Sequence, residues 1–131
     1  MQRAIELAKK GMGYVSPNPM VGCVVVKDDK IIAEGYHEKY GQYHAERNAL
    51  LSCTEDTAGA DLYVTLEPCQ MCAGAIVLAR VPTVVWGVSD PKRGGATQFD
   101  IFAHPGVNHH PTVVPGVLEE EARAGRILVM S

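Results

Sequence analysis

Two short fragments of the 131-residue chain carry side chains that can bind a metal, HAE at 44–46 and PCQMC at 68–72. If a helix begins near Cys69, then Cys69 and Cys72 project from one face of its first turn, because residues three apart are neighbours on a helix. The free N–H groups and positive dipole end at such a start stabilise thiolates over thiols. Pro68 suits this position because its missing N–H would have no intrahelical partner.

A second helix beginning near His44 would bring an imidazole and the Glu46 carboxylate into one turn. One histidine and two cysteines make three protein ligands, the number typical of a catalytic zinc that keeps its fourth position for water. Zinc lowers the pKa of such a water from about 15.7 to around 7. We therefore predict a hydrolytic zinc site with His44, Cys69 and Cys72 as metal ligands and Glu46 as the catalytic proton shuttle.

The pattern H-x-E followed by P-C-x-x-C is the signature of zinc enzymes that deaminate nucleobases. Two other interpretations compete with it. A lone C-x-x-C is also typical of a thioredoxin-like redox pair, which would bind no zinc. A non-catalytic, zinc-bearing partner subunit would typically lose the carboxylate, whereas this chain keeps Glu46.

Composition places the chain among ordinary globular proteins, with 47% apolar and 21% charged residues. We expect residues 1–131 to form a single zinc deaminase domain. The net charge of -3 argues against an extended nucleic-acid surface, although a short single strand remains compatible with it.

No apolar run is long enough to span a membrane and no signal peptide is evident, so we expect a cytoplasmic protein whose four cysteines are free thiols.

The periodicity of apolar residues and the turn residues predict the elements that position these fragments. Helices are expected at about 2–10, 44–53, 70–80 and 117–124. Strands are expected at 21–27, 31–36, 61–66, 82–88 and 112–114, with a rigid SPNP loop at 16–19 and a long loop at 89–111. Helices alternating with apolar strands predict a three-layer α/β/α sandwich around one mixed sheet of about five strands.

The sequence resembles the cytidine-deaminase superfamily over nearly its whole length. Residues 1–69, with SPNPMVGCVVVKD, EGYHEKYG, HAERNAL and YVTLEPC, look like the deaminase domain of the bifunctional riboflavin-pathway protein. Residues 68–116, with PCQMCAGAIVLAR, VVWGVSDPKRGG and HPGVNHH, are closer to the bacterial tRNA adenosine deaminases. Both resemblances imply the three-layer fold, His44, Cys69 and Cys72 as zinc ligands, and Glu46 as acid and base.

The resemblance also implies a set of substrate contacts. It indicates that the backbone near residues 66–68 faces the base, and that Asn18 of the PNP loop lies at the substrate. A flipped base could stack on an aromatic side chain such as Trp86 or Phe99. The residues predicted to bind substrate are Asn18, His37, Leu66, Glu67, Pro68, Trp86 and Asp90.

Two substrates follow from the two halves of the chain. The main prediction is an adenosine or cytosine base in tRNA or single-stranded nucleic acid, because the half after Cys69 is of the tRNA type. The alternative is a phosphoribosylated diaminopyrimidine, the substrate of the riboflavin-pathway family. We also expect a homodimer, because the segment 70–80 is apolar enough to bury two faces.

Overall fold

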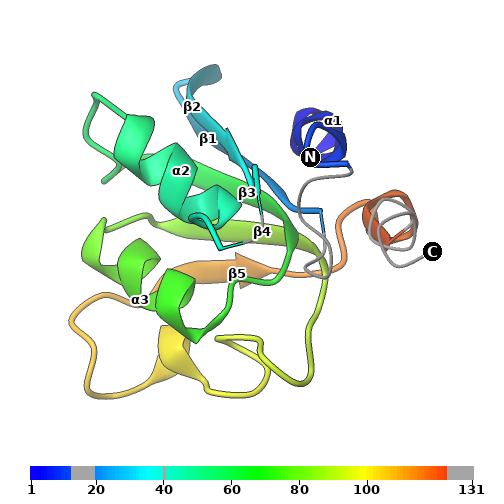
Figure 1. Ribbon diagram of the computed structural model, residues 1–131. Coiled ribbons are helices and arrows are strands. Elements are labelled where there is room, and N and C mark those ends of the chain that lie inside the picture. Colours follow the sequence, from blue (N-terminus) through cyan, green and yellow to red (C-terminus); the bar gives the residue numbers. More distant parts are fainter. Residues whose placement is uncertain (13–19, 40, 124–131) are drawn as a thin grey trace.

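The strands form one mixed sheet in the order β2-β1-β3-β4-β5. The computed structural model describes residues 1–12, 20–39 and 41–123 (Figure 1). Its strands are β1 (Gly22–Lys27), β2 (Lys30–Tyr36), β3 (Asp61–Leu66), β4 (Thr83–Val88) and β5 (Thr112–Val114). Its helices are α1 (Gln2–Lys9), α2 (Ala45–Ser52) and α3 (Gln70–Leu78), with a short 3₁₀ turn, η1 (Ile101–Ala103). The predicted mixed sheet of about five strands is confirmed.

Local sequence explains how neighbouring strands are joined. β1 and β2 form an antiparallel hairpin, whose turn residues Asp28 and Asp29 both take positive φ angles, of 53° and 62°. Asp is among the residues that such tight hairpin turns favour. β1 also pairs antiparallel with β3, whereas β3, β4 and β5 run parallel. Parallel neighbours need a long crossover, and α3 provides the one between β3 and β4.

Both faces of the sheet are covered, which explains the unbroken apolar run in β1. Cys23 and Val25 pack into the core formed with α2 and α3, whereas Val24 packs against α1 on the opposite face. Figure 1 shows α1 and the helical residues 119–123 on one side of the sheet, with α2 and α3 on the other. This is the predicted three-layer α/β/α sandwich.

Glycines allow two of the helices to approach the sheet closely. A Cβ at Gly22 would collide with the backbone of Ala4 in α1. A Cβ at Gly35 would lie 2.5 Å from both the Ala45 carbonyl oxygen and the Ala49 amide nitrogen in α2. The two glycines therefore set the heights of α1 and α2 above opposite faces of the sheet.

The boundaries of the described elements differ from the sequence predictions by at most two residues. The predicted loop at 89–111 is more ordered than expected, because it contains η1 and a series of hydrogen-bonded turns between residues 90 and 101. The predicted SPNP loop and residue 124 lie outside the described residues. Within the described ranges, no helix combines the length and apolarity that a bilayer crossing requires.

Candidate zinc site

The starts of α2 and α3 meet on one face of the sheet. His44 is the N-cap residue of α2 and Cys69 is the N-cap residue of α3, and both have extended backbone angles. Cys72 lies in the first turn of α3, and the two helices are in contact. Two positive helix ends therefore converge on the three side chains that were predicted to bind metal.

The distances between these side chains suit a tetrahedral metal ion. His44 Nδ1 lies 3.6 Å from Cys69 Sγ and 3.5 Å from Cys72 Sγ, and all three donor atoms lie within 4.8 Å of one another. Bonds of about 2.3 Å to sulfur and 2.0–2.1 Å to nitrogen at tetrahedral angles place sulfur and nitrogen roughly 3.6 Å apart. The donor set therefore fits zinc in both its chemistry and its spacing.

The titration of the two thiols points to the same conclusion. Hydrogen bonds from the Cys72 thiol and from the His44 ring hold the pKa of Cys69 down to about 4. The hydrogen bond to Cys69, followed by burial, raises the pKa of Cys72 above its ordinary value. The hydrogen bond to Cys69 also raises the pKa of His44. These groups alone favour a single thiolate, so a divalent cation is what would allow both sulfurs to be thiolates.

Glu46 lies beside the donor atoms and outside the donor set. Its side chain is buried, with 3% exposed, and burial raises its pKa to about 7. The neighbouring His44 and Cys72 act against this effect by lowering the pKa of Glu46, which places the carboxylate close to both donor residues. A carboxylate in this position can exchange protons with a reactant at the metal without being a ligand itself.

His37 follows β2 and borders the site. Its ring meets the His44 ring edge to face, with centroids 5.6 Å apart and planes at 84°. Its Nδ1 lies 3.0 Å from the Tyr43 carbonyl oxygen, and the side chain is buried. The structure thus brings His37 next to a predicted zinc ligand, where its substrate role remains a prediction.

The three residues before Cys69 lie at the end of β3, next to the donors. Leu66 is half-buried and Pro68 is fully buried. The Glu67 carboxylate is buried and accepts hydrogen bonds from Asp90, Ala96 and Thr97. The prediction that backbone at 66–68 faces the base is compatible with this placement, whereas the Glu67 side chain is already engaged.

The remaining predicted contacts are more scattered. Trp86 is 2% exposed, stacks with Phe102 in the core and donates a hydrogen bond to Ser89 Oγ, so its ring has no open face for a base. Phe99, the other aromatic considered for stacking, is 41% exposed. Asp90 is half-buried and caps a turn by accepting from the amides of residues 92 and 93. Asn18 lies outside the described residues.

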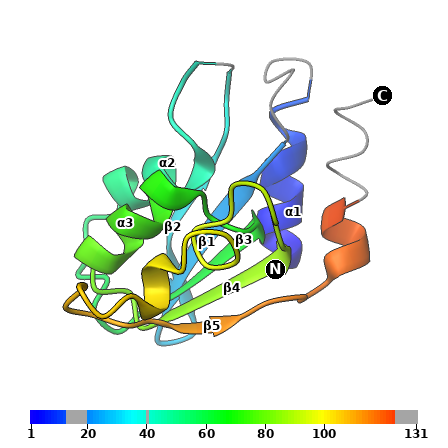
Figure 2. The ribbon, with the colours of Figure 1, turned by 90° about the horizontal axis from the view of Figure 1, so that it is seen from below.

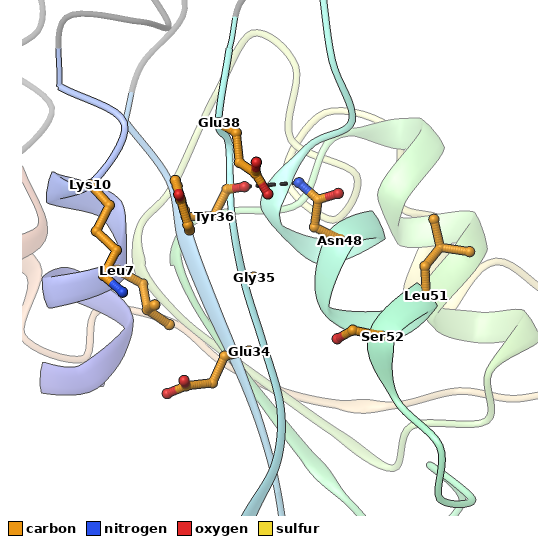
Figure 3. Close-up of a pocket in the computed structure, with 9 residues that line it drawn as sticks. All are labelled: Leu7, Lys10, Glu34, Gly35, Tyr36, Glu38, Asn48, Leu51 and Ser52. Atoms are coloured by element: carbon orange, nitrogen blue, oxygen red, sulfur yellow. Dashed lines mark hydrogen bonds between the residues drawn. The ribbon is translucent and has the colours of Figure 1, made fainter.

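A pocket of about 560 Å³ lies away from this site, along the outer edge of β2 between α1 and α2 (Figure 3). Leu7 and Lys10 from α1 line one side and Leu51 from α2 the other. Asn48 Nδ2 donates to the Tyr36 carbonyl oxygen across it, at 2.8 Å. None of the three donor residues lines this pocket, so we assign the chemistry to the meeting point of α2 and α3.

Two residues at the site were missed by sequence reasoning. Cys23, in β1, is fully buried, and burial followed by the nearby Glu46 raises the pKa of its thiol, so it lies near the Glu46 carboxylate. Thr97 donates through both its amide and its hydroxyl to Glu67. An apolar strand and an irregular loop offered no periodic signal for either residue.

Comparison with known proteins agrees with this geometry. The sequence model of the cytidine and deoxycytidylate deaminase zinc-binding region matches residues 1–88, and the chain belongs to this family. The riboflavin biosynthesis protein RibD of Actinobacillus pleuropneumoniae is 48% identical over 95% of this chain. The diaminohydroxyphosphoribosylamino-pyrimidine deaminase of Buchnera aphidicola (subspecies Schizaphis graminum) is 45% identical over 70% of this chain and 67% of its own length.

Solved structures extend the comparison. A Thermotoga maritima protein superposes on this chain with a TM-score of 0.85 and 47% sequence identity. The superposition covers 97% of this chain and 38% of that protein, whose name joins a diaminohydroxyphosphoribosylaminopyrimidine deaminase to a reductase. A structure from a study of tRNA:A34 deaminases superposes with a TM-score of 0.76 at 32% identity, covering 88% of this chain and 95% of its own. The chain spans about a third of the length of the Actinobacillus relative, 34%. Both predicted resemblances are therefore confirmed at the level of the superfamily.

Proposed function

We propose that residues 1–131 act as a single zinc deaminase domain, and that its substrate is a phosphoribosylated diaminopyrimidine. The observation that carries the substrate is the 45% identity to a relative named for that deamination, of which this chain covers 67%. The tRNA:A34 deaminase structure is less similar, at 32% identity. These similarities favour the alternative over the nucleic-acid base that was the main prediction, and a tRNA adenosine becomes the second candidate.

In the proposed mechanism, His44, Cys69 and Cys72 would hold zinc, which would lower the pKa of water and so make hydroxide available at neutral pH. Glu46 takes up the proton from the attacking water and delivers it to the ring nitrogen beside the amine-bearing carbon. A second transfer through the same carboxylate lets the amine leave as ammonia. The net reaction converts a ring amine and water into a ring carbonyl and ammonia.

An ammonia-release assay tests the substrate. Purified zinc-loaded protein is given the phosphoribosylated diaminopyrimidine, an RNA hairpin with an unpaired adenosine, single-stranded DNA, or free cytidine. We expect kcat/KM for the pyrimidine nucleotide to exceed the others by at least about 100-fold, a ratio that pocket contacts can produce. Faster turnover of the RNA hairpin would instead support the second candidate.

We also propose that the chain forms a homodimer through the outer surfaces of α2 and α3. Leu51 and Met71 are exposed there, and Leu78 is 82% exposed. Exposed apolar clusters on a monomer often mark an interface. In light scattering, Leu78→Asp should shift the mass toward that of one chain, whereas Ile31→Asp, at an exposed site on β2, should not. A wild-type mass equal to one chain would contradict the proposal.

We propose that this chain resides in the cytoplasm, a reducing compartment, because its cysteines are free thiols. Cys23, Cys53, Cys69 and Cys72 are all free thiols. Disulfides form and persist mainly in oxidising compartments, and thiolate zinc ligands need reducing conditions.

A further inference from the structure

Glu67 is a buried carboxylate whose partners all come from one loop. Only 3% of the residue is exposed. Oε1 accepts from the Asp90 amide at 3.0 Å and from the Thr97 hydroxyl at 2.6 Å. Oε2 accepts from the Ala96 amide at 3.0 Å and the Thr97 amide at 2.7 Å. An ionised carboxylate offers about four lone-pair sites, so these four donors fill them.

The same loop, residues 90–97, lies against the backbone that leads into α3 (Figure 2). The Gly95 amide donates to the Pro68 carbonyl oxygen at 2.7 Å, and Gly94 forms an antiparallel bridge with Cys69. A Cβ at Gly94 would collide with the Glu67 carboxylate, and one at Gly95 would lie 2.5 Å from Ala73 Cβ. The loop therefore packs directly on the residues that present the Cys69 thiol.

We propose that Glu67 is a positioning residue for the zinc site rather than a substrate contact. Its carboxylate holds the loop at 90–97, and the loop in turn fixes the backbone of Pro68 and Cys69. Hydrogen bonds to a charged acceptor are roughly twice as strong as neutral ones, and here they are shielded from water. The direction of the Cys69 thiol toward the metal thus depends on a side chain that does not touch the metal. The inference rests on the zinc site of the proposed function.

Three variants isolate this role. Glu67→Gln keeps the size of the side chain, but an amide nitrogen in place of either oxygen would face two hydrogen-bond donors. Thr97→Val removes a single hydroxyl donor and leaves the carboxylate in place, whereas Thr97→Ser retains that hydroxyl. Glu34→Gln serves as the matched control, because it removes a carboxylate on β2 that lines the separate pocket away from the zinc site.

Metal binding is the readout, and it needs no substrate. Zinc affinity is measured by competition with a chelator, and the thiolate environment by the visible absorption of the cobalt(II)-loaded protein. We expect Glu67→Gln to weaken zinc binding by about 10–100-fold, the usual effect of losing a residue that orients a metal ligand. Its cobalt bands should also shift. Thr97→Val should show a smaller loss in the same direction, and Thr97→Ser and Glu34→Gln should match the wild type.

The outcomes separate the two proposals. Unchanged zinc affinity and cobalt spectrum in Glu67→Gln, even with a lower melting temperature, would mean that Glu67 only supports the fold, and would overturn the inference. If Glu67→Gln does not fold, Thr97→Val decides between the two roles by the same two measurements. A wild-type protein that binds neither zinc nor cobalt would refute the proposed function itself, and this inference with it.

Discussion

Two residues at the start of α2, His44 and Glu46, have different tasks in the proposed mechanism. His44 Nδ1 faces both thiols, whereas the buried Glu46 carboxylate lies beside Cys72 and outside the donor set. A proton shuttle in this position contributes typically 10²–10⁴-fold to a rate. The division of tasks can be tested one residue at a time.

Glu46→Gln should therefore retain one zinc per chain while kcat falls by about 10²–10⁴-fold, because an amide cannot accept the proton. Metal analysis and ammonia release, measured on the same preparation, check both halves. His44→Ala is the complementary variant and should lose metal and activity together. Turnover near the wild-type rate in Glu46→Gln would rule out the proposed shuttle.

The zinc donors could be foreseen at the scale of single residues, whereas the surroundings could not. The spacing of Cys69 and Cys72 indicated them together with the HAE fragment at 44–46, because a helix start brings residues three apart to one face. The partners of Glu67 lie 23 to 30 residues further along the chain, in a loop without periodicity. Trp86 was expected to face a base, but β4 is buried on both faces and the Trp86 ring stacks on Phe102 in the core.

At the scale of elements, the position of α2 depends on Gly35. Adding a methyl group there would force α2 away from β2, and α2 is capped by His44 and carries Glu46. Gly22→Ala is the matched variant, because it displaces α1 on the opposite face. We expect both to lower the free energy of unfolding by about 1–3 kcal/mol, as overpacking does.

Only Gly35→Ala should also weaken zinc binding, since α2, unlike α1, begins next to a predicted zinc ligand, His44. Denaturant unfolding of the metal-free proteins measures the free energy of unfolding. Competition with a chelator measures the zinc affinity of the metal-loaded proteins. Equal losses of zinc affinity in both variants would show that the site responds to general destabilisation rather than to the position of α2.

A surface ion pair joins α1 to β2 and should make stability depend on pH. Arg3 Nε donates to Glu34 Oε2 at 2.6 Å, and this hydrogen bond lowers the pKa of Glu34. A lowered carboxyl pKa stabilises the folded state above the ordinary value of about 4.3, and the effect is lost as the pH falls through the lowered pKa. The contribution is small, because solvent reaches both partners, with 40% of the Arg3 side chain and 31% of the Glu34 side chain exposed.

The wild type should accordingly be slightly more stable than Glu34→Gln at neutral pH, and the difference should vanish in acid. Urea unfolding of the metal-free proteins across this pH range measures it, and removing the metal avoids the effect of acid on the zinc ligands. If the difference in stability between the wild type and Glu34→Gln persisted in strong acid, its cause would be packing rather than charge.

The elements themselves were predictable, because apolar periodicity and turn residues mark them along the chain. The order of the strands was not, since nothing local specifies that β1 lies between β2 and β3. Pairings between distant segments depend on how whole faces pack. The 3₁₀ turn η1 was missed because it lies within a loop rich in Gly and Pro, where no apolar periodicity marks a single turn.

For the whole molecule, zinc would act as a cross-link between two helices. A ligand that binds only the folded state stabilises it by about 4 kcal/mol at a thousand times its dissociation constant. For a domain of this size that corresponds to a rise in melting temperature on the order of 10 °C. Calorimetry with and without chelator should show this shift in the wild type and in Glu46→Gln, and His44→Ala should show none. An unchanged wild-type melting temperature would argue against a bound metal.

The zinc donors and the proton shuttle all fall within one continuous stretch, residues 44–72, which contains α2, β3 and the start of α3. The surroundings come from outside it, with His37 before the stretch and the loop at 90–97 after it. Evolution can therefore vary the surroundings while the reaction centre is inherited intact. Relatives named for a pyrimidine nucleotide and for a tRNA position share this fold at 47% and 32% identity.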